Sequence, residues 1–387
     1  MHWNSIRTKV LALLACGLAA GVGGTLTLLR YSFAKNSQAL AAESVRNAQR
    51  LFGILEAREI SKMAVVGDTL VLNPEVRDAF AAGDRDRLLT LTAPLYPKLE
   101  GITDWIFHLP EPDMSVFLRL HEPARYGDRL NRFIDREVAR THSLVAGNEL
   151  ANAGFDIRII QPFPDAHGRL IGYVEFGEEL GLFIREMKKE TGDDYGLLLS
   201  KKFLNRRFWA DTSAFLERRD NWNDNPAFVV ADRTTANESI IQFHGDVATV
   251  AGRGKVLERF EDGTSVFVRG IFPIPDAAGN AVGAVFVVRD ISGVYRSMRS
   301  TQNILVLLSI GGLLIGGVLL LALLNRMVFR RLEHIIRVAT RVVGGDYQSI
   351  IQIRSDDEIG RFEQLFEQFR CVFVDLLANL SELEENT

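Results

Sequence analysis

Two long runs without charged residues constrain the fold of this 387-residue chain more than any other feature. The first run covers residues 10–29 and the second covers residues 304–324. About 20 apolar residues is the length that an α-helix needs to cross the hydrocarbon core of a membrane, where backbone groups must pair within the helix. We therefore expect two transmembrane helices and a lipid bilayer as a partner of the chain.

Basic residues lie close to the outer ends of both runs, and basic residues favour the cytoplasmic side of a membrane. The sequence therefore predicts a two-pass protein of a bacterial inner membrane, with both termini inside and residues 31–303 in the periplasm. A cleaved signal peptide is the alternative for the first run, but this run is longer than a signal sequence needs. The flanking basic residues are Arg7, Lys9, Arg326, Arg330 and Arg331.

Composition excludes several classes of function. A net charge of −4 gives no signature of nucleic-acid binding. The two cysteines, Cys16 and Cys371, suit neither a disulfide framework nor a zinc site. The chain has no His-Glu-x-x-His, Gly-x-Ser-x-Gly or complete P-loop motif. We therefore expect no enzymatic activity, no cofactor and no bound metal.

A sequence repeat lies between the two apolar runs. Residues 158–174 and 269–285 share Pro-x-Pro-Asp-Ala-x-Gly and several flanking residues at a fixed offset of 111 positions. Such self-similarity indicates a duplicated structural unit. Proline, aspartate and glycine favour a tight turn, and alternating apolar residues flank it, so each copy predicts a β-hairpin. Another hairpin is expected from strands at 255–260 and 264–269.

A helical pattern precedes the repeat, over residues 31–67. Val45, Ala48, Phe52 and Leu55 follow the three- and four-residue spacing of one helix face. The predicted fold class is α+β: two tandem PAS-like antiparallel-sheet modules on a long stalk helix, two transmembrane helices, and a cytoplasmic parallel coiled-coil bundle.

This arrangement resembles the double-Cache sensory domains of bacterial chemoreceptors and sensor histidine kinases. Residues 117–121 (Phe-Leu-Arg-Leu-His), 126–128 (Tyr-Gly-Asp) and 171–177 (Ile-Gly-Tyr-Val-Glu-Phe-Gly) are similar to the membrane-distal module of that family. The resemblance covers most of residues 31–300 and implies a fold that binds small ligands.

Strand alternation predicts a ligand site in the first module. Arg119 and His121 share one face of their strand, and Tyr173 and Glu175 share a face of another, while Arg158 lies on a third strand. Two guanidinium groups can bind a carboxylate by paired hydrogen bonds. Tyr173 would orient the ligand and Glu175 would bind an amino group, which favours a small carboxylate or an amino acid. The alternative is a structural ion pair between Arg119 and Glu175 on an exposed sheet face.

The second copy of the repeat has Ala284 and Phe286 where the first has Tyr173 and Glu175. We therefore expect the membrane-distal module to bind a ligand and the membrane-proximal module to transmit the signal.

The segment after the second apolar run resembles a HAMP domain, a parallel four-helix bundle made by two chains. Leu332, Ile336, Ala339 and Val343 form one helix face, and a second helix from residue 359 repeats apolar residues every three and four positions to Leu380. Arg331 and Glu367 depart from the family, which usually has proline and asparagine there. The residues that match the family are Gly345, Asp346, Asp357, Glu358, Gly360 and Phe366.

These expectations divide the chain into consecutive segments. They are the cytoplasmic N-terminus 1–9, transmembrane helix 10–29, stalk 31–67, distal module 68–190, proximal module 191–300, transmembrane helix 304–324, HAMP domain 326–380 and tail 381–387.

The sequence predicts a homodimeric transmembrane receptor that senses a small extracytoplasmic ligand. A separate cytoplasmic kinase, cyclase or chemotaxis-type protein would read its HAMP bundle, because no output domain follows in this sequence. One alternative is a truncated receptor that lacks its output domain. Another is a membrane-anchored scaffold for a periplasmic partner, without a small ligand.

Overall fold

The computed structural model describes the backbone of most of the chain, and the chain divides into two compact units. One unit is residues 33–296, and the other consists of the terminal segments on either side of it. For some residues in the helices near both ends of the chain, Leu380 among them, the structure describes the backbone alone. The same holds for Phe215. The described residues are 6–99, 101–150, 154–215, 217–353 and 356–385.

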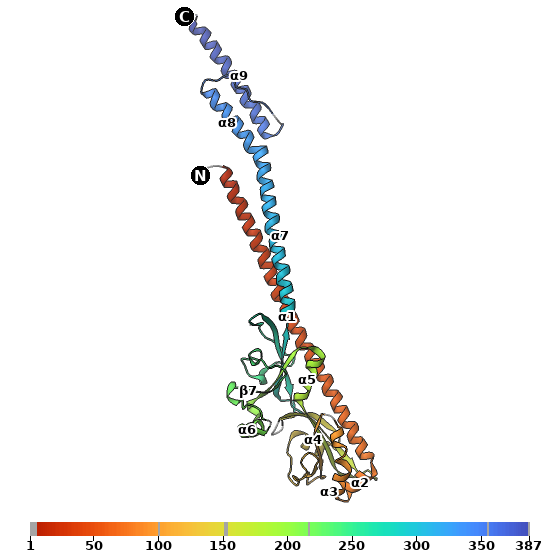
Figure 1. Cartoon of the computed structure of the whole chain (residues 1–387). Coiled ribbons are helices and arrows are strands. Elements are labelled where there is room, and N and C mark those ends of the chain that lie inside the picture. The colour runs from red at the N-terminus through yellow and green to blue at the C-terminus, as the bar shows by residue number, and fades with distance from the viewer. Residues whose placement is uncertain (1–5, 100, 151–153, 216, 354–355, 386–387) are drawn as a thin grey trace. The chain divides into compact units, whose positions relative to one another are not determined.

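Helix α1 (Ile6–Leu72) supplies the long helix that the two sheets of residues 33–296 share (Figure 1). The predicted apolar stripe is buried, with exposed fractions from 1% at Ala48 to 6% at Phe52. The Phe52 ring lies near Phe183 of the first module and Phe272 of the second. An amphipathic helix buries such a stripe against whatever apolar surface faces it, and here that surface comes from both modules.

The distal module is built on a five-stranded antiparallel sheet with the strand order β2-β1-β5-β4-β3. Its strands are β1 (Ile102–His108), β2 (Val116–Arg119), β3 (Val145–Leu150), β4 (Phe155–Pro164) and β5 (Leu170–Glu179).

One face of this sheet is apolar, with Trp105, Phe107, Phe163 and Phe176 fully buried. Phe80 packs edge-on against Phe107 and Phe163. Strand alternation leaves the opposite face to polar residues, and helix α4 lies on that side. The helices of the module are α2 (Pro74–Ala81), α3 (Arg85–Thr92) and α4 (Phe133–Thr141), with a short 3₁₀ turn at Tyr96–Lys98.

The proximal module has a six-stranded antiparallel sheet with the order β7-β6-β11-β10-β8, and β9 also pairs with β10. Helix α5 (Leu180–Thr191) connects the two modules, and α6 (Arg206–Phe215) follows β6. The prediction of two tandem antiparallel-sheet modules is therefore confirmed. The strands are β6 (Asp194–Ser200), β7 (Phe228–Arg233), β8 (Lys255–Val256), β9 (Phe260–Asp262), β10 (Ser265–Pro275) and β11 (Ala281–Asp290).

Both copies of the repeat form the predicted hairpins, β4–β5 and β10–β11. In each turn the aspartate side chain accepts two backbone N–H groups: Asp165 from residues 167 and 169, and Asp276 from residues 278 and 280. The two turns are built alike because the same local chemistry specifies them. The other predicted hairpin forms between β9 and β10, but residues 255–256 belong to a separate strand, β8.

The turn of the second hairpin lies against the distal sheet. The backbone N–H of Ala277 donates to the carbonyl oxygen of Asn148 in β3, at 2.7 Å. A Cβ atom added at Gly147 would lie only 2.7 Å from the Cβ of Ala277. Glycine at this position therefore permits the close approach of the two modules.

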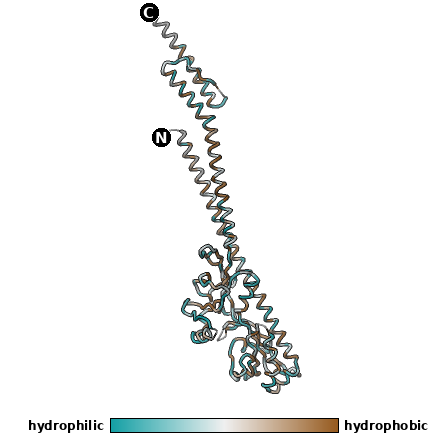
Figure 2. Tube along the Cα trace, in the orientation of Figure 1, coloured by the Kyte–Doolittle hydropathy of each residue, from teal (hydrophilic) through white to brown (hydrophobic). Residues whose placement is uncertain are grey.

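Helix α7 (Ser292–Leu324) begins at the end of the unit of residues 33–296 and continues through a π-helical turn (Asn325–Phe329) into α8 (Arg330–Val343). Within the part of the chain that the structure describes, Ser292–Val343 is the one helical stretch apolar and long enough to cross a membrane, and Figure 2 shows the hydrophobic colour along α7. The first apolar run lies in α1 and does not meet the same criterion among the described residues.

Helices α8 and α9 (Glu358–Glu385) enclose a small apolar core made of Ile335, Val338, Val342 and Ile351. The stripe predicted for the first helix differs from this one: Ile336 is 62% exposed and Val343 is 90% exposed. Helix α8 carries two adjacent apolar stripes, and within one chain only one of them can face α9 and the connector.

Candidate functional site

The register of the distal sheet places four of the five predicted ligand-binding residues on its polar face. Glu175 in β5 lies opposite Ile160 and Ile106, and Arg119 in β2 also lies opposite Ile106. Arg158 lies opposite Gly177, whose missing side chain leaves space for the guanidinium group: a Cβ there would be 3.1 Å from Nη1 of Arg158. Tyr173 lies on the same face by alternation along β5. His121 lies two residues beyond the end of β2, and its Nε2 atom is 3.5 Å from Asp104.

Glu175 is the centre of this face and has no exposed surface. Its two oxygens accept hydrogen bonds from Arg132 at 2.7 and 2.6 Å, from Arg158 at 2.7 Å, and from Nε2 of His108 at 2.7 Å. Burial alone would raise the pKa of the Glu175 carboxyl, but the charges of Arg132 and Arg158 and the bond to His108 hold it well below its usual range. Glu175 is therefore a buried carboxylate that holds two arginines.

Arg132 is the residue immediately before helix α4, and local hydrogen bonds fix its position. The Asp135 carboxylate accepts the backbone N–H of Arg132 at 2.8 Å, as in a capping box, and also pairs with its guanidinium group. The backbone N–H of Ile134 donates to Glu149 in β3 at 3.1 Å. The start of α4 is thus attached to both β3 and β5.

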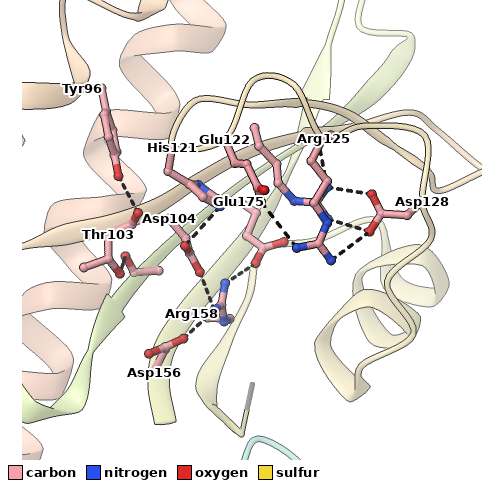
Figure 3. Close-up of polar contacts among 12 residues, drawn as sticks. Tyr96, Thr103, Asp104, His121, Glu122, Arg125, Asp128, Asp156, Arg158 and Glu175 are labelled. Carbon is pink, nitrogen blue, oxygen red and sulfur yellow. Dashed lines mark hydrogen bonds and ion pairs between the residues drawn. The ribbon is translucent and has the colours of Figure 1, made fainter. Parts of the chain in front are cut away.

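Arg158 is nearly fully buried and contacts two further carboxylates, Asp104 and Asp156 (Figure 3). Burial raises the pKa of the Asp156 carboxyl to about 6, because the loss of water outweighs the opposing charge of Arg158 and the negative charge of Asp104 adds to it. The group therefore changes its charge close to neutral pH.

Arg119 and His121 lie at the edge of this network and do not contact Glu175. Arg119 donates through both terminal nitrogens to Asp128, at 2.7 and 2.8 Å, and also to the backbone oxygen of Arg125. The hydrogen bond from Arg119 lowers the pKa of Asp128. His121 lies 3.5 Å from Asp104, and burial lowers the pKa of the His121 imidazole.

Tyr173 is buried and its hydroxyl contacts Glu111 and Nδ1 of His142, the latter at 3.1 Å. Burial raises the pKa of Tyr173, and the hydrogen bond to Glu111 raises it further. The structure therefore brings Arg158 and Glu175 into contact, whereas Arg119, His121 and Tyr173 each bind other partners on the same face.

The ligating atoms of His108, Asp135 and Glu175 lie within 4.8 Å of one another, a spacing that a metal ion could bridge. The guanidinium of Arg132 already bridges both carboxylates. A metal would have to displace a buried cation and sit beside Arg158, so this group fits an ion-pair network better than a metal centre.

Several residues of the network had no part in the predicted site. Asp104 and His108 alternate along β1 in the same way as the residues of β4 and β5, so the same pattern could have found them. Arg132 and Asp128 lie outside strands, and only the packing of the whole module brings them to the sheet.

The fold is a pair of antiparallel-sheet domains on one long helix, with a charged face on the distal domain. The chain belongs to the double-Cache family described as "Double sensory domain of two-component sensor kinase", whose sequence profile matches residues 66–295. The predicted resemblance to this family is confirmed. No curated protein matches the chain in a sequence search.

Similar solved structures are sensor domains of low sequence identity. The periplasmic domain of Vibrio cholerae LuxQ is 10% identical, with 65% of this chain and 99% of that chain covered and a TM-score of 0.38. The sensor domain of the V. cholerae histidine kinase DctB is 10% identical, covering 65% and 98%, with a TM-score of 0.39. The ligand-binding domain of the Campylobacter jejuni chemoreceptor Tlp3, in complex with L-valine, is 11% identical, covering 69% and 96%, with a TM-score of 0.38.

Proposed function

We propose that the chain is a transmembrane receptor of the bacterial inner membrane, with residues 31–303 in the periplasm. Its distal module binds a small carboxylate or amino acid, and paired HAMP-like helices pass the signal to a separate cytoplasmic protein. The family is sensory, and its members in chemoreceptors and histidine kinases bind ligands, which supports the general class. The observation that carries the proposal is the arginine-rich polar face of the distal sheet.

Arg119 is the residue of this face that is best placed to receive a ligand carboxylate. Its partner Asp128 has 37% of its side chain exposed, more than any carboxylate paired with Arg132 or Arg158. Asp128 follows Gly127, which has a φ of +85°. A ligand carboxylate can take the place of Asp128 and accept the same two hydrogen bonds from the guanidinium fork.

The neighbouring groups suit the other end of an amino acid. Asp104 lies between His121 and Arg158 with 22% of its side chain exposed, so it can accept a ligand ammonium group. Glu175 has no exposed surface, and its role here is to position Arg158 and Arg132. A ligand that rearranged Arg158 would therefore act on Glu175, Arg132 and helix α4.

A path of contacts leads from this face to α7. Ile134, Val138, Ile160 and Tyr173 form a small cluster on the polar side of the sheet, and Ala277 packs against it. Ala277 belongs to the β10–β11 turn that docks on β3, and β11 ends at residue 290, just before α7 begins. A shift of α4 or β3 can therefore move the hairpin that continues into the membrane helix.

Arg331 and Glu367, the two residues that depart from the HAMP pattern, both form contacts between elements. Arg331 pairs with Asp357 at 2.6 Å and with Glu363 at 3.0 Å, which ties the start of α9 to α8. Glu367 accepts the backbone N–H of Ile351 at 3.1 Å and so fixes the connector to α9. These contacts support the proposal that α8, the connector and α9 act as one relay element.

Ligand binding to the full-length receptor in lipid nanodiscs tests the proposal. We expect an amino acid or dicarboxylate from a metabolite panel to raise the melting temperature saturably. Arg119→Ala removes the guanidinium fork and should weaken that ligand roughly tenfold or more. Arg129→Ala is the matched control, because Arg129 forms an exposed ion pair with Asp113 in the same segment. Equal ligand affinity in the Arg119 variant would overturn this assignment.

The second candidate function is that of a membrane-anchored scaffold that binds no small ligand. The ion-pair network around Glu175 favours this function, because its charged groups already pair with one another. Every basic group there already has a carboxylate partner, as in a purely structural core. In that case no metabolite shifts the melting temperature of the wild-type protein, and Arg119→Ala changes stability alone.

A further inference from the structure

The same strand position contacts helix α1 in both modules. At the offset of 111 residues that relates the two copies of the repeat, Glu178 in β5 corresponds to Arg289 in β11. Arg289 donates to the hydroxyl of Ser44 in α1 at 3.1 Å, and Glu178 accepts from Lys62 in α1 at 3.1 Å. Each sheet is therefore fastened to the long helix through an equivalent residue, and in the distal sheet that residue is a carboxylate.

Glu178 shares Lys62 with a second carboxylate, Glu59 of α1. Both carboxylates are almost fully buried, with 8% of the Glu178 side chain and 7% of the Glu59 side chain exposed. A Cβ atom added at Gly101 would lie 2.8 Å from the carboxylate of Glu178, so glycine leaves the room that this group needs. Two buried negative charges that share one lysine repel each other, and a proton taken up by one of them removes that repulsion.

The groups around this pair supply little further positive charge. Arg58 donates to Glu59 at 2.9 Å, but it also pairs at 2.8 Å with Glu186 of α5, the helix that Figure 1 shows beside α1. The strands on either side of β5 place Ile102 and Ile157 opposite Glu178 and so bring no charge to it. Among the described residues, Lys62 is therefore the one cation that pairs with Glu178.

The two carboxyl groups differ in how readily they take up a proton. Burial raises the pKa of Glu178 against the opposing charge of Lys62, and the negative charge of Glu59 raises it further. Burial alone would also raise the pKa of Glu59, but Lys62, Arg58 and a hydrogen bond with Glu178 lower it. Glu178 is therefore the member of the pair that binds the proton as the pH falls, and its hydroxyl then donates to the Glu59 carboxylate.

We propose that Glu59 and Glu178 form a proton-sensitive clamp that fastens helix α1 to the distal sheet. In acid, one proton bridges the two carboxyl groups and holds the helix against the strand. At neutral pH both groups are charged and repel each other across Lys62, so the helix is held less tightly. Because α1 also contains the first apolar run, the clamp gives the chain an input that responds to acidity. It needs no small ligand, so its test is independent of the test of the distal ligand site.

Hydrogen–deuterium exchange of the full-length protein in nanodiscs tests the clamp. The backbone amides of residues 56–66 should have protection factors roughly threefold or more higher at about pH 5 than at about pH 7.5, because protonated Glu178 stabilises the attached helix. Glu178→Gln keeps a hydrogen-bond donor but cannot titrate, so the ratio between the two protection factors should fall by roughly threefold or more. Asp156 titrates in the same range in both proteins, so comparing them isolates the effect of Glu178.

Glu186→Gln is the matched control. It removes a carboxylate that is 38% exposed and pairs with Arg58 outside the clamp, so the wild-type pH response should persist. Glu59→Gln tests the same pair from the helix side and should reduce the pH response as Glu178→Gln does. The clamp is refuted if wild-type α1 is protected equally at both pH values. It is also refuted if folded Glu178→Gln and Glu59→Gln proteins keep the wild-type response, or if Glu186→Gln loses it to the same extent.

Discussion

At the scale of single residues, the raised pKa of Asp156 is the consequence of burying several charged groups on one sheet face. Asp104, Asp156 and Glu175 all contact Arg158, so one guanidinium group serves three carboxylates. Glu175 has the additional support of Arg132 and keeps a low pKa, whereas Asp156 has no second cation and its pKa rises to about 6. The fold therefore shifts the pKa values of the two carboxyls in opposite directions.

Stability of the fragment 33–296 should fall as the pH rises from about 4.5 to 6.5. The folded state holds a proton on Asp156 up to about pH 6, while the unfolded state loses it near 3.8, so the raised pKa stabilises the fold only at lower pH. The full effect is roughly 3 kcal/mol, since one pKa unit corresponds to about 1.4 kcal/mol. Asp156→Asn should flatten the dependence of the free energy of unfolding on pH, measured by urea denaturation.

Asp165→Asn is the control for this experiment. Backbone N–H groups, first that of Arg169, lower the pKa of the Asp165 carboxyl, so it titrates below the window measured. The wild-type slope should persist in that variant. If the Asp156 variant also kept the wild-type slope, the raised pKa would be wrong.

Strand alternation correctly predicted that Arg119, Arg158 and Glu175 share a sheet face, because side-chain direction along a strand is a local property. It could not predict which groups touch. The strongest partner of Glu175 is Arg132, 43 residues away in a loop, and the partner of Arg119 is Asp128 in another loop. Loop conformation depends on the packed module, so the ion pairs had no signal in the sequence.

At the scale of elements, the repeated turns were predictable and the choice between helix faces was not. The turns form because proline, aspartate and glycine act within a few residues. Helix α8 buries Ile335, Val338 and Val342, while the adjacent stripe of Ile336 and Val343 stays exposed. Both stripes are apolar, and the spacing alone does not say which one meets the chain's own second helix.

The docking of the β10–β11 turn on β3 gives a prediction at this scale. Gly147→Ala would place a Cβ atom 2.7 Å from the Cβ and 3.0 Å from the Cα of Ala277, so the turn must move away. We expect a loss of about 1–3 kcal/mol in the free energy of unfolding of residues 33–296, as for overpacking in a core. Urea denaturation of the purified fragment measures it.

Gly53→Ala is the matched control for that substitution. Gly53 lies in helix α1, and a Cβ atom added there would have no neighbour within 4 Å, so alanine should stabilise the helix by about 0.5–1 kcal/mol. Opposite signs for the two glycine variants would support the docked turn. A neutral or stabilising effect at Gly147 would show that the modules do not touch there.

At the scale of the whole molecule, helix α9 exposes apolar residues that the predicted homodimer would bury. Phe362, Phe369 and Leu376 belong to the predicted coiled-coil seam and are 51%, 66% and 56% exposed. Phe366 belongs to the same seam but packs partly against the core between α8 and α9. Exposed phenylalanines at heptad spacing are typical of an interface between helices, so we expect the receptor to be a homodimer.

Disulfide crosslinking in membranes tests this dimer. In a chain whose exposed Cys16 and Cys371 are replaced by serine, Phe369→Cys should give covalent dimers, because the seam brings residue 369 of the two chains together. Gln364→Cys is the control: it is also exposed on α9 but lies outside the seam, so it should crosslink several times more slowly. Equal rates at both positions would indicate random collision, and no product at residue 369 would contradict the parallel bundle on which the proposed relay depends.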